Sequence, residues 1–382
     1  MDSGPEVFVI AGEPSGDHHA AMLGEALMRR GGVTLAGVGQ SRMRETGFEL
    51  LFDSTGWSGI GVVESLKRVP RLIARKAQLV RHLLERSPDL LVLVDFGAFN
   101  VRLARSLRER LEAPILYYFP PRSWSRSADY RGLAGLFDRV ATPFEWSEKL
   151  LRDAGLQAEW VGHPVVDRIK AADPVRKRRL REGFGIAGDD LVIGLLPGSR
   201  PTEIRCNGPQ MLGAARSIAR EIDSASFLLS RAPAIAEETL RAQIFRHELQ
   251  SRTSVAEGVS EIVEAADFVI TSCGTATLET AAAVCPMVIV YRGTALMSLE
   301  KRLRRFNPTF VGMPNIIAGE AIVPELIDQD ALAPKIAQTA LDLLTDKAKN
   351  DAMRERLVSV REKLGSPGVS DRVAGMLFDM IG

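Results

Sequence analysis

The 382-residue chain is poor in cysteine and in aromatic side chains, carries almost no net charge and has no long apolar run. Its three cysteines, Cys206, Cys273 and Cys285, are an odd number without the spacing of metal ligands, so we expect no disulfide framework and a reducing compartment. The net charge of +1 argues against a nucleic-acid-binding protein held by overall electrostatics. A transmembrane helix needs about 18 consecutive apolar residues, and no run reaches that length. The start, MDSGPEV, lacks the basic region of a signal peptide, and these features together predict a cytoplasmic protein.

What the chain does contain is an alternation of short apolar strands and helical segments. A content of 46% hydrophobic and 25% charged residues is typical of a globular protein with two or three domains. The pattern predicts an α/β fold of two Rossmann-like domains with parallel sheets. A charged segment between Asp173 and Glu182 indicates the boundary between them. We expect an N-terminal domain over 1–168, a C-terminal domain over 185–348, and helices over 349–382 for which a return to the first domain stays open.

The most informative segment is ADFVITSCGTATLETAAA, from Ala266 to Ala283. It predicts a buried strand, a small-residue turn and a helix that begins at Thr275. Such a turn presents free backbone N–H groups and the positive end of the helix dipole, which favours phosphate binding. Glu279 follows one helical turn later, where a carboxylate can accept hydrogen bonds from ribose hydroxyls. An ordinary βα unit with a capped helix is the alternative.

Other polar residues also follow expected strands. Asp95 comes directly after the apolar strand Leu90–Val94, and residues beyond the carboxyl ends of such strands line the ligand crevice. Its alternative role is a helix N-cap or turn former. His163 is either a structural histidine or part of an interdomain cleft. The five histidines are scattered and no carboxylate pair stands at an expected strand end, so we expect no metal site and no cofactor.

The segment from Glu64 to Arg86 contains seven basic and two acidic residues, a local net charge of +5. It predicts two amphipathic helices split by Pro70, with a shared apolar face that we assign to Leu66, Val69, Ile73, Ala77, Val80 and Leu84. The basic residues are either a solvated face or a surface that attracts anionic lipid or a phosphorylated substrate. Just before them, the glycine-rich stretch Gly56–Gly61 indicates a functional or hinge loop.

A set of motifs in a fixed order extends over nearly the whole chain. They are GEPSGD at Gly12–Asp17, PFE at Pro143–Glu145, VGHPVVD at Val161–Asp167, LPGSR at Leu196–Arg200 with Glu203, GTATLE at Gly274–Glu279, PMVIVYR at Pro286–Arg292, MPNIIAG at Met313–Gly319 and VPEL at Val323–Leu326. By these motifs the chain resembles the lipid-A-disaccharide synthase family, inverting glycosyltransferases of the GT-B fold. The resemblance is densest between Leu196 and Leu326.

The resemblance implies transfer of 2,3-diacylglucosamine from UDP to the 6-hydroxyl of 2,3-diacylglucosamine 1-phosphate, which forms a β-1,6 disaccharide in lipid A biosynthesis. It places the catalytic aspartate at Asp95, which as a general base would take the proton of the acceptor hydroxyl. The implied UDP-binding residues are Ser199, Arg200, Glu203, Gly274, Thr275, Ala276, Glu279 and Asn315. The acceptor-binding residues that we assign are Glu13, Ser15, Asp17, Arg122, Trp124 and Arg126. No metal is implied. The implied site of action is the cytoplasmic face of the inner membrane, as a peripheral protein, with oligomerisation left open and no nucleic-acid partner.

The departures from the family pattern lie on the acceptor side. The family's DAPDFN is DFGAFN here, so that Gly97 and Ala98 replace a proline and an aspartate. The family's SPQVWAWR-like loop is PPRSWSRS, which keeps Trp124 and adds Arg122 and Arg126. We expect a loop that gains positive charge to favour a phosphorylated acceptor. The alternative is a loop that is merely solvated.

Three other functions are compatible with the sequence. A related GT-B transferase would use a similar UDP-sugar on a different acceptor. A UDP-GlcNAc 2-epimerase would share the two-domain architecture but need further carboxylates and histidines in its site. A catalytically inactive binding module is suggested only by the loss of the second aspartate, at Ala98.

Overall fold

The computed structural model describes residues 4–57, 62–170, 173–186, 188–233, 235–293 and 309–382. Within 62–170, side chains are described from residue 69 onward. The chain divides into two compact units. Unit 1 contains Met1–Asp167 and Leu364–Gly382, and unit 2 contains Arg168–Lys363. The last helix therefore belongs to unit 1, whereas the segments 168–184 and 349–363 belong to unit 2. The return to the first domain that the sequence left open is made by Leu364–Gly382.

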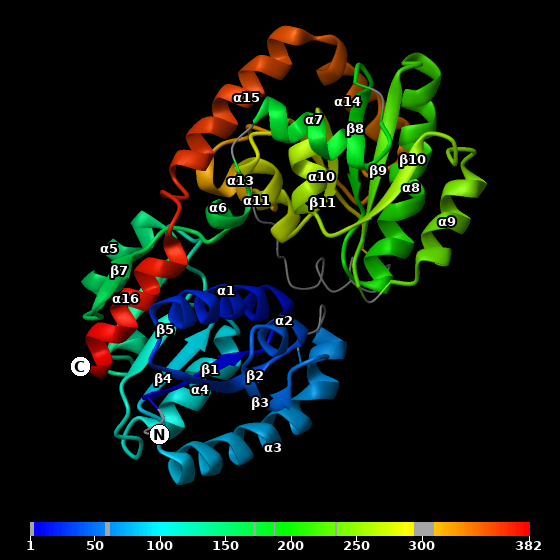
Figure 1. The fold of residues 1–382 in the computed structure, drawn as a ribbon. Helices are drawn as coiled ribbons and strands as arrows, with labels where there is room; N and C mark the ends of the chain where they lie inside the picture. Colours follow the sequence, from blue (N-terminus) through cyan, green and yellow to red (C-terminus); the bar gives the residue numbers. More distant parts are fainter. Residues whose placement is uncertain (1–3, 58–61, 171–172, 187, 234, 294–308) are drawn as a thin grey trace. The chain divides into compact units, whose positions relative to one another are not determined.

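Unit 1 is built on a seven-stranded, fully parallel sheet in the order β3-β2-β1-β4-β5-β6-β7 (Figure 1). Its central strands are continuous apolar runs because helices cover both faces of the sheet. The strand bounds are β1 Glu6–Ala11, β2 Thr34–Gly39, β3 Glu49–Asp53, β4 Leu90–Val94, β5 Ile115–Tyr118, β6 Arg139–Thr142 and β7 Ala158–Trp160.

Two groups of helices cover the sheet of unit 1. Helices α1 and α16 pack against each other on one face, and α3 and α4 pack together on the other, where their apolar side chains join the main core of the unit (Figure 1). The helix bounds are α1 Pro14–Arg30, α2 Ser41–Glu45, α3 Val62–Arg86, α4 Gly97–Leu107, the 3-10 helix Arg131–Leu133, α5 Glu145–Asp153, α6 Val165–Arg168 at the end of the unit, and α16 Val369–Ile381.

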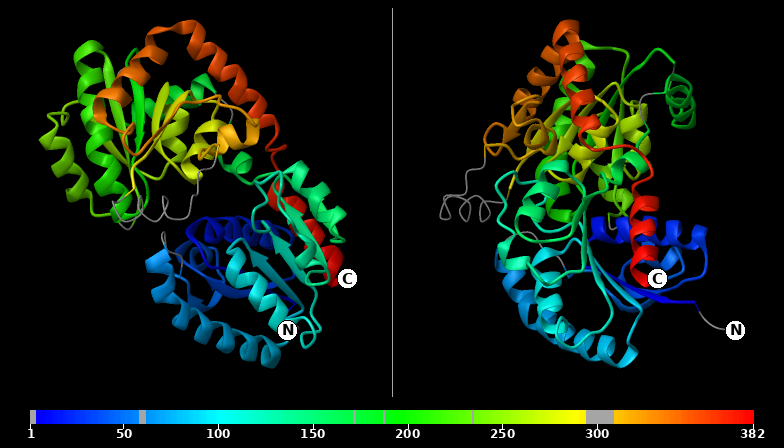
Figure 2. Two further views of the ribbon diagram at one scale, coloured as in Figure 1. Left: turned by 180° about the vertical axis from the view of Figure 1, so that it is seen from behind. Right: turned by 90° about the vertical axis from the view of Figure 1, so that its left-hand side faces the viewer.

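Unit 2 has a six-stranded parallel sheet in the order β10-β9-β8-β11-β12-β13. Helices α8 and α14 pack against each other, while α11 contacts α10, α13 and α15 (Figure 2). The strands are β8 Leu191–Leu196, β9 Ala225–Arg231, β10 Thr253–Glu257, β11 Phe268–Ser272, β12 Met287–Tyr291 and β13 Glu325–Ile327. The helices are α7 Pro174–Gly183, α8 Pro201–Glu221, α9 Glu237–Arg246, α10 Ser260–Ala265, α11 Thr275–Ala282, α13 Met313–Ala318, α14 Ala333–Thr345 and α15 Lys347–Glu362.

Three strands are not evident from the apolar runs of the sequence, and all three lie at an edge of a sheet. They are β3 and β7 at the two ends of the first sheet and β13 at one end of the second. An edge strand pairs on one side only and is covered less, so its sequence need not be a continuous apolar run. The residues of β3, ELLFD, illustrate this point, because they begin and end with an exposed carboxylate.

The expected pair of helices split by Pro70 is wrong. Residues Val62–Arg86 form one helix, α3, that continues through the proline. The expected apolar face is only partly right. Val80 and Leu84 pack against the core, but Val69 and Ile73 are 42% and 60% exposed, and the fully buried residues are Leu79 and Leu83. Spacing alone could not distinguish the two faces, because both carry apolar residues three or four positions apart. Leu66 lies outside the described side chains.

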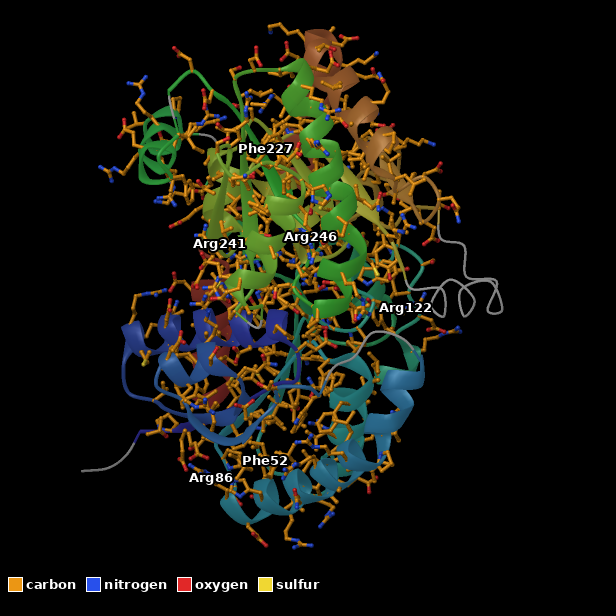
Figure 3. The ribbon with its side chains drawn as sticks, turned by 90° about the vertical axis from the view of Figure 1, so that its right-hand side faces the viewer. Phe52, Arg86, Arg122, Phe227, Arg241 and Arg246 are labelled. Carbon is orange, nitrogen blue, oxygen red and sulfur yellow. The ribbon has the colours of Figure 1, made fainter. Side chains whose placement is uncertain are left out.

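Several of the basic residues of α3 have partners within unit 1. Arg86 forms ion pairs with Glu6 and Glu49, and the guanidinium of Arg75 lies 4.5 Å from the ring centroid of Phe52. Figure 3 shows Phe52 and Arg86 in this part of the unit. These residues are accordingly tied to the unit itself, which leaves less free positive charge on α3 than the sequence predicts. Of the stretch Gly56–Gly61, residues 58–61 lie outside the described residues.

The N-terminus of α16 is held by a residue that is distant in the sequence. The carboxylate of Asp167 accepts hydrogen bonds from the backbone N–H groups of Gly368, Val369 and Ser370, at 2.6, 3.2 and 3.1 Å. These are the donors that a helix cannot satisfy itself, and a negative charge also complements the helix dipole. Asp167 therefore fastens the last helix to the rest of unit 1.

Candidate functional site

In each sheet the strand order reverses at one place: between β1 and β4 in unit 1, and between β8 and β11 in unit 2. Helices leave the two adjacent strands toward opposite faces there, so the carboxyl ends of the strands border an uncovered crevice where ligands bind in open α/β sheets. Asp95 and the turn Gly12–Asp17 lie at the first reversal. The turns Leu196–Arg200 and Gly274–Glu279 lie at the second. The structure thus brings these predicted residues to one place in each unit, whereas Arg122, Trp124 and Arg126 follow β5 and Asn315 lies in α13.

Asp95 is held by its backbone rather than by its side chain. It has a φ of 49° and Phe96 a φ of 48°, two successive left-handed residues that are not glycine, a conformation that persists only where neighbours enforce it. The N–H of Asp95 donates to the Tyr118 carbonyl at 2.9 Å. Its carbonyl accepts from Asn100 Nδ2 at 2.8 Å and from the Tyr117 hydroxyl at 2.9 Å. Three contacts therefore fix the position of Asp95.

The carboxyl group of Asp95 has an altered acidity. Burial is the main cause that raises its pKa to about 7; the negative charge of nearby Glu13 adds to this effect, and the backbone N–H of Phe96 opposes both. No side-chain hydrogen bond caps α4, which excludes the alternative role of Asp95 as its N-cap. A carboxyl group with a pKa near neutrality can accept and release a proton at working pH.

The turn from β1 to α1 carries two acidic residues, Glu13 and Asp17, which differ in exposure. Glu13 is the N-cap residue of α1 and is partly exposed, as is Ser15. Asp17 is 2% exposed, and its carboxylate accepts backbone hydrogen bonds from Gln40 and Arg42 at 2.5 and 3.1 Å. Asp17 therefore fastens α1 to the start of α2, and its contact with an acceptor stays a prediction.

The expected pair of arginines after β5 is not directed at Asp95. The guanidinium of Arg126 lies 4.2 Å from the ring centroid of Trp146. The charge of Arg122 contributes to the lowered pKa of Asp129, where the Arg131 side chain has the largest effect. Figure 3 shows Arg122 in the loop after β5, where Trp124 is 44% exposed. The charged group that shifts the pKa of Asp95 is Glu13, not either arginine.

One of the departures from the family pattern has a steric explanation. A Cβ atom on Gly97 would lie 2.5 Å from Cβ of Pro121. No side chain fits at that distance, so the loop after β5 approaches the start of α4 only because residue 97 is glycine. The structure gives no comparable reason for Ala98, which is exposed.

In unit 2, Glu203 shapes the turn after β8. Its Oε2 accepts from the backbone N–H groups of Ser199 and Arg200 at 2.8 and 3.2 Å, and its Oε1 accepts from Arg200 Nη1 at 3.1 Å. Through these contacts Glu203 positions the turn, and its contact with a nucleotide stays a prediction. The side chain of Arg200 keeps 41% of its surface exposed.

Asn207, which was not among the predicted site residues, supports this same turn. It is fully buried. Its Nδ2 donates to the Pro197 carbonyl at 3.1 Å, and its Oδ1 accepts from the Arg292 N–H at 3.0 Å. Asn207 thereby links the end of β8 to the end of β12. An amide inside an otherwise apolar helical pattern was the available signal.

The second turn of unit 2 joins β11 to α11 through Gly274, whose φ of 145° suits glycine. Thr275 and Ala276 are the first two residues of α11, where backbone N–H groups have no acceptor within the helix. Thr277 Oγ1 donates to the Gly274 carbonyl at 2.8 Å and accepts from the Met313 N–H at 3.3 Å. The turn is thus tied to the start of α13.

Glu279 and Asn315 are both buried, at 7% and 1% exposure. Glu279 forms an ion pair with Arg168. Asn315 has no hydrogen-bonding capacity left: its Nδ2 donates to the Val323 carbonyl and to Glu325, and its Oδ1 accepts from the N–H groups of Ile322 and Val323. Asn315 therefore acts as an internal support in this structure, and its place in the nucleotide site stays a prediction.

Glu325, which also lies in a quoted motif, completes that support. Its two carboxylate oxygens accept from the backbone N–H groups of Val311 and Gly312, both at 2.9 Å. His163 is likewise structural, because it is 7% exposed and its Nδ1 accepts from the Val165 N–H at 3.1 Å. In the part of the chain that the structure describes, no three His, Cys, Asp or Glu residues gather as a metal site. No described helix is long and apolar enough to cross a bilayer.

Comparisons with known proteins agree with the sequence motifs. The family model described as lipid-A-disaccharide synthetase matches residues 7–371. The chain is 35% identical over 380 residues to the lipid-A-disaccharide synthase of Geobacter sulfurreducens, covering 98% of this chain and 97% of that protein. It is 34% identical over 385 residues to that of Myxococcus xanthus, covering 100% and 99%.

Solved structures of lower identity share the fold. One is the UDP-GlcNAc 2-epimerase of Neisseria meningitidis, with a TM-score of 0.61 at 12% identity, covering 98% of this chain and 100% of that one. Another is MurG of Acinetobacter baumannii, with a TM-score of 0.59 at 13% identity, covering 98% and 99%. The expected α/β class with two parallel sheets is confirmed.

Two adjacent tyrosines offer a test of how Asp95 is held. Tyr117 and Tyr118 are both fully buried on β5, but only the hydroxyl of Tyr117 donates to Asp95, whereas that of Tyr118 has no hydrogen-bond partner in the described structure. We expect Tyr117→Phe to lower the free energy of unfolding by about 1 kcal/mol. Tyr118→Phe, the matched control, should leave stability unchanged or raise it, because it removes an unsatisfied buried group. Urea titrations of both variants measure the difference, and equal losses would contradict it.

Proposed function

Because the chain belongs to the lipid-A-disaccharide synthetase family, we propose that it transfers 2,3-diacylglucosamine from UDP to the 6-hydroxyl of 2,3-diacylglucosamine 1-phosphate. The products are a β-1,6-linked disaccharide and UDP. The match over residues 7–371 supports this assignment. The observation that carries the chemistry is the position and acidity of Asp95, which stands at the end of β4 with a pKa of about 7.

The donor belongs to unit 2 in this proposal. The N–H groups of Thr275 and Ala276 and the guanidinium of Arg200 would bind the diphosphate, since both a helix N-terminus and an arginine favour phosphate. The backbone of Ser199 and of Gly274 would lie near the diphosphate. Glu279 would accept hydrogen bonds from the ribose hydroxyls. Glu203 and Asn315 act on the donor only through the turns that they hold.

The acceptor belongs to unit 1. The carboxylate of Asp95 takes the proton of the acceptor 6-hydroxyl while the oxygen attacks the anomeric carbon of the donor sugar. The bond from that carbon to the UDP oxygen breaks with inversion, and its electron pair leaves on the diphosphate, where Arg200 and α11 stabilise the charge. Glu13 and Ser15 remain the acceptor contacts that the turn offers, together with Trp124 and Arg122 of the loop after β5.

A 2-epimerase is the weaker candidate. Its support is a likeness of fold at 12% identity, and such a likeness does not extend to the reaction. Among the residues at the two strand reversals, Asp95 and Glu13 are the partly exposed carboxylates of unit 1. This set suits a transferase with one general base better than an enzyme that needs several acid–base groups.

Contact with a membrane surface would suit the acylated substrates. On α3, the apolar side chains of Val69 and Ile73 are exposed beside Arg71, which is also exposed. Apolar residues next to a basic one are typical of a helix that lies in the headgroup region of an anionic bilayer. We assign this surface of α3 to the inner membrane.

Asp95→Asn is the test of the reaction. It should lower the rate of UDP release in the presence of acylated acceptor by about 10²–10⁴-fold, because the base is lost, while UDP affinity by calorimetry stays close to that of wild type. Arg200→Ala provides the contrast and should weaken UDP binding by about 1.5–3 kcal/mol. Turnover of Asp95→Asn within tenfold of wild type would exclude this base.

The acidity of Asp95 predicts a pH dependence. A base must be ionised, so kcat/KM should rise with pH through the pKa of about 7. Since the charge of Glu13 helps to raise that pKa, Glu13→Gln should shift the rise of kcat/KM, the acidic limb of the pH profile, to lower pH. The position of the limb, and not its height, is the readout, because Glu13 also contacts acceptor in this proposal. Asp129→Asn is the control and should leave the limb in place; an unmoved limb in Glu13→Gln would contradict the coupling.

The membrane assignment predicts a selective loss of vesicle binding. The double variant Val69→Ser, Ile73→Ser should co-sediment less with vesicles that contain phosphatidylglycerol, because it removes the exposed apolar area. Leu332→Ser and Val358→Ser, at exposed apolar positions in unit 2, are the controls. Equal binding of the double variant and wild type would exclude this surface of α3.

A further inference from the structure

Glu279 shares its buried environment with one cation. Arg168, the first residue of unit 2, extends from the end of α6 to the middle of α11, where its Nη2 donates to Oε1 of Glu279. The two side chains are 23% and 9% exposed. A buried carboxylate without a partner tends to take up a proton, and a cation at hydrogen-bond distance favours the ionised form. Arg168 thus decides the charge state of Glu279.

The pair uses only one of the two carboxylate oxygens. Arg168 binds Oε1, and no described residue donates a hydrogen bond to Oε2. An ionised carboxylate accepts through about four lone-pair positions. Fixing Oε1 to a buried guanidinium sets the rotation of the carboxylate and leaves Oε2 free to accept from a ligand.

We propose that Arg168 is a positioning residue for nucleotide binding, which orients Glu279 and keeps it charged so that Oε2 can accept from the ribose hydroxyls of UDP. The inference rests on the proposed function and adds to it the residue that controls selection of ribose. Arg168 does not itself contact the nucleotide in this proposal. This role cannot be predicted from the sequence, because residues 168 and 279 come close only in the folded unit.

The other charges around α11 do not replace Arg168. On α15, Arg361 donates to the carbonyl of Ala282 at the end of α11, and Arg354 donates to the carbonyls of Val284 and Asp267. On α10, Glu264 forms an ion pair with Arg176 of α7. β11 (FVITS) and α13 (MPNIIA) contribute no charged residues. Burial is the larger effect and raises the pKa of Glu279 above its ordinary value, while Arg168 lowers it; among the described residues, Arg168 is the charged group that shifts this pKa.

The alternative is that the ion pair merely joins α6 to α11. A purely structural tie would affect stability and the affinity for every nucleotide alike. A positioning role has a different signature: it changes the preference for ribose over deoxyribose, and it makes that preference depend on pH. The ratio of dissociation constants for 2′-deoxy-UDP and UDP therefore separates the two roles.

The experiment measures both nucleotides by calorimetry between pH 5.5 and 8.5. Wild type should bind UDP about 10–100-fold more tightly than 2′-deoxy-UDP, as expected of a charge-assisted hydrogen bond. In Arg168→Gln the ratio should fall to about threefold or less at pH 6.5 and recover as the pH rises, because Glu279 must then ionise without its cation. Arg176→Gln breaks a comparable buried pair and should leave the ratio unchanged at every pH.

Arg168→Lys covers the case in which the glutamine variant does not fold. It keeps the charge but not the planar guanidinium, so the preference for UDP over 2′-deoxy-UDP should persist at pH 8. As the pH is lowered, this variant should lose the preference at a higher pH than wild type does. A wild-type ratio and pH dependence in whichever arginine variant folds would overturn the proposal. Wild-type protein that binds both nucleotides equally would overturn the ribose role of Glu279 as well. Wild-type protein that does not bind UDP would overturn the proposed function itself.

Discussion

In each sheet the order of the strands reverses next to the first strand, β1 in unit 1 and β8 in unit 2. The position of this reversal determines where a ligand can reach the turns. Helices on one side of the reversal leave toward one face, and those on the other side leave toward the opposite face. The carboxyl ends of β1 and β4, and of β8 and β11, are therefore the places in each unit where turns are not covered by a crossover helix. The positions of the proposed base and of the turns and glutamate that we propose to bind UDP all follow from that constraint.

Polar residues at these reversals have two different tasks. Asp17, Glu203 and Asn315 use their side chains on backbone groups of the chain itself. Buried backbone N–H and C=O groups need partners, and tight turns supply few of their own. Such side chains therefore maintain the shape of the turns, which leaves partly exposed neighbours such as Glu13 and Arg200 to face a ligand. The motifs of the family thus combine supports with contacts.

Most of the fold could be predicted from the sequence, but the division of tasks within the motifs could not. The central strands were evident because burial on both faces requires continuous apolar runs, as in Leu90–Val94. The face of α3 was misassigned because its buried and exposed sides both carry apolar residues. Glu13 and Asp17 are chemically alike and four residues apart, and only the position of α2 makes one of them internal. The partnership of Arg168 with Glu279 likewise depends on contacts between segments far apart in the sequence.

The return of the chain to unit 1 has a consequence for synthesis on the ribosome. Unit 2 is one uninterrupted segment, whereas unit 1 consists of Met1–Asp167 and Leu364–Gly382. α16 packs against α1 and β4, and Asp167 accepts hydrogen bonds from the N-terminus of α16. Because a chain emerges from its N-terminus onward and domains fold as units, unit 2 can complete its structure while unit 1 still exposes the surface of α1 that α16 will cover. The part that is translated first is therefore the part that is finished last.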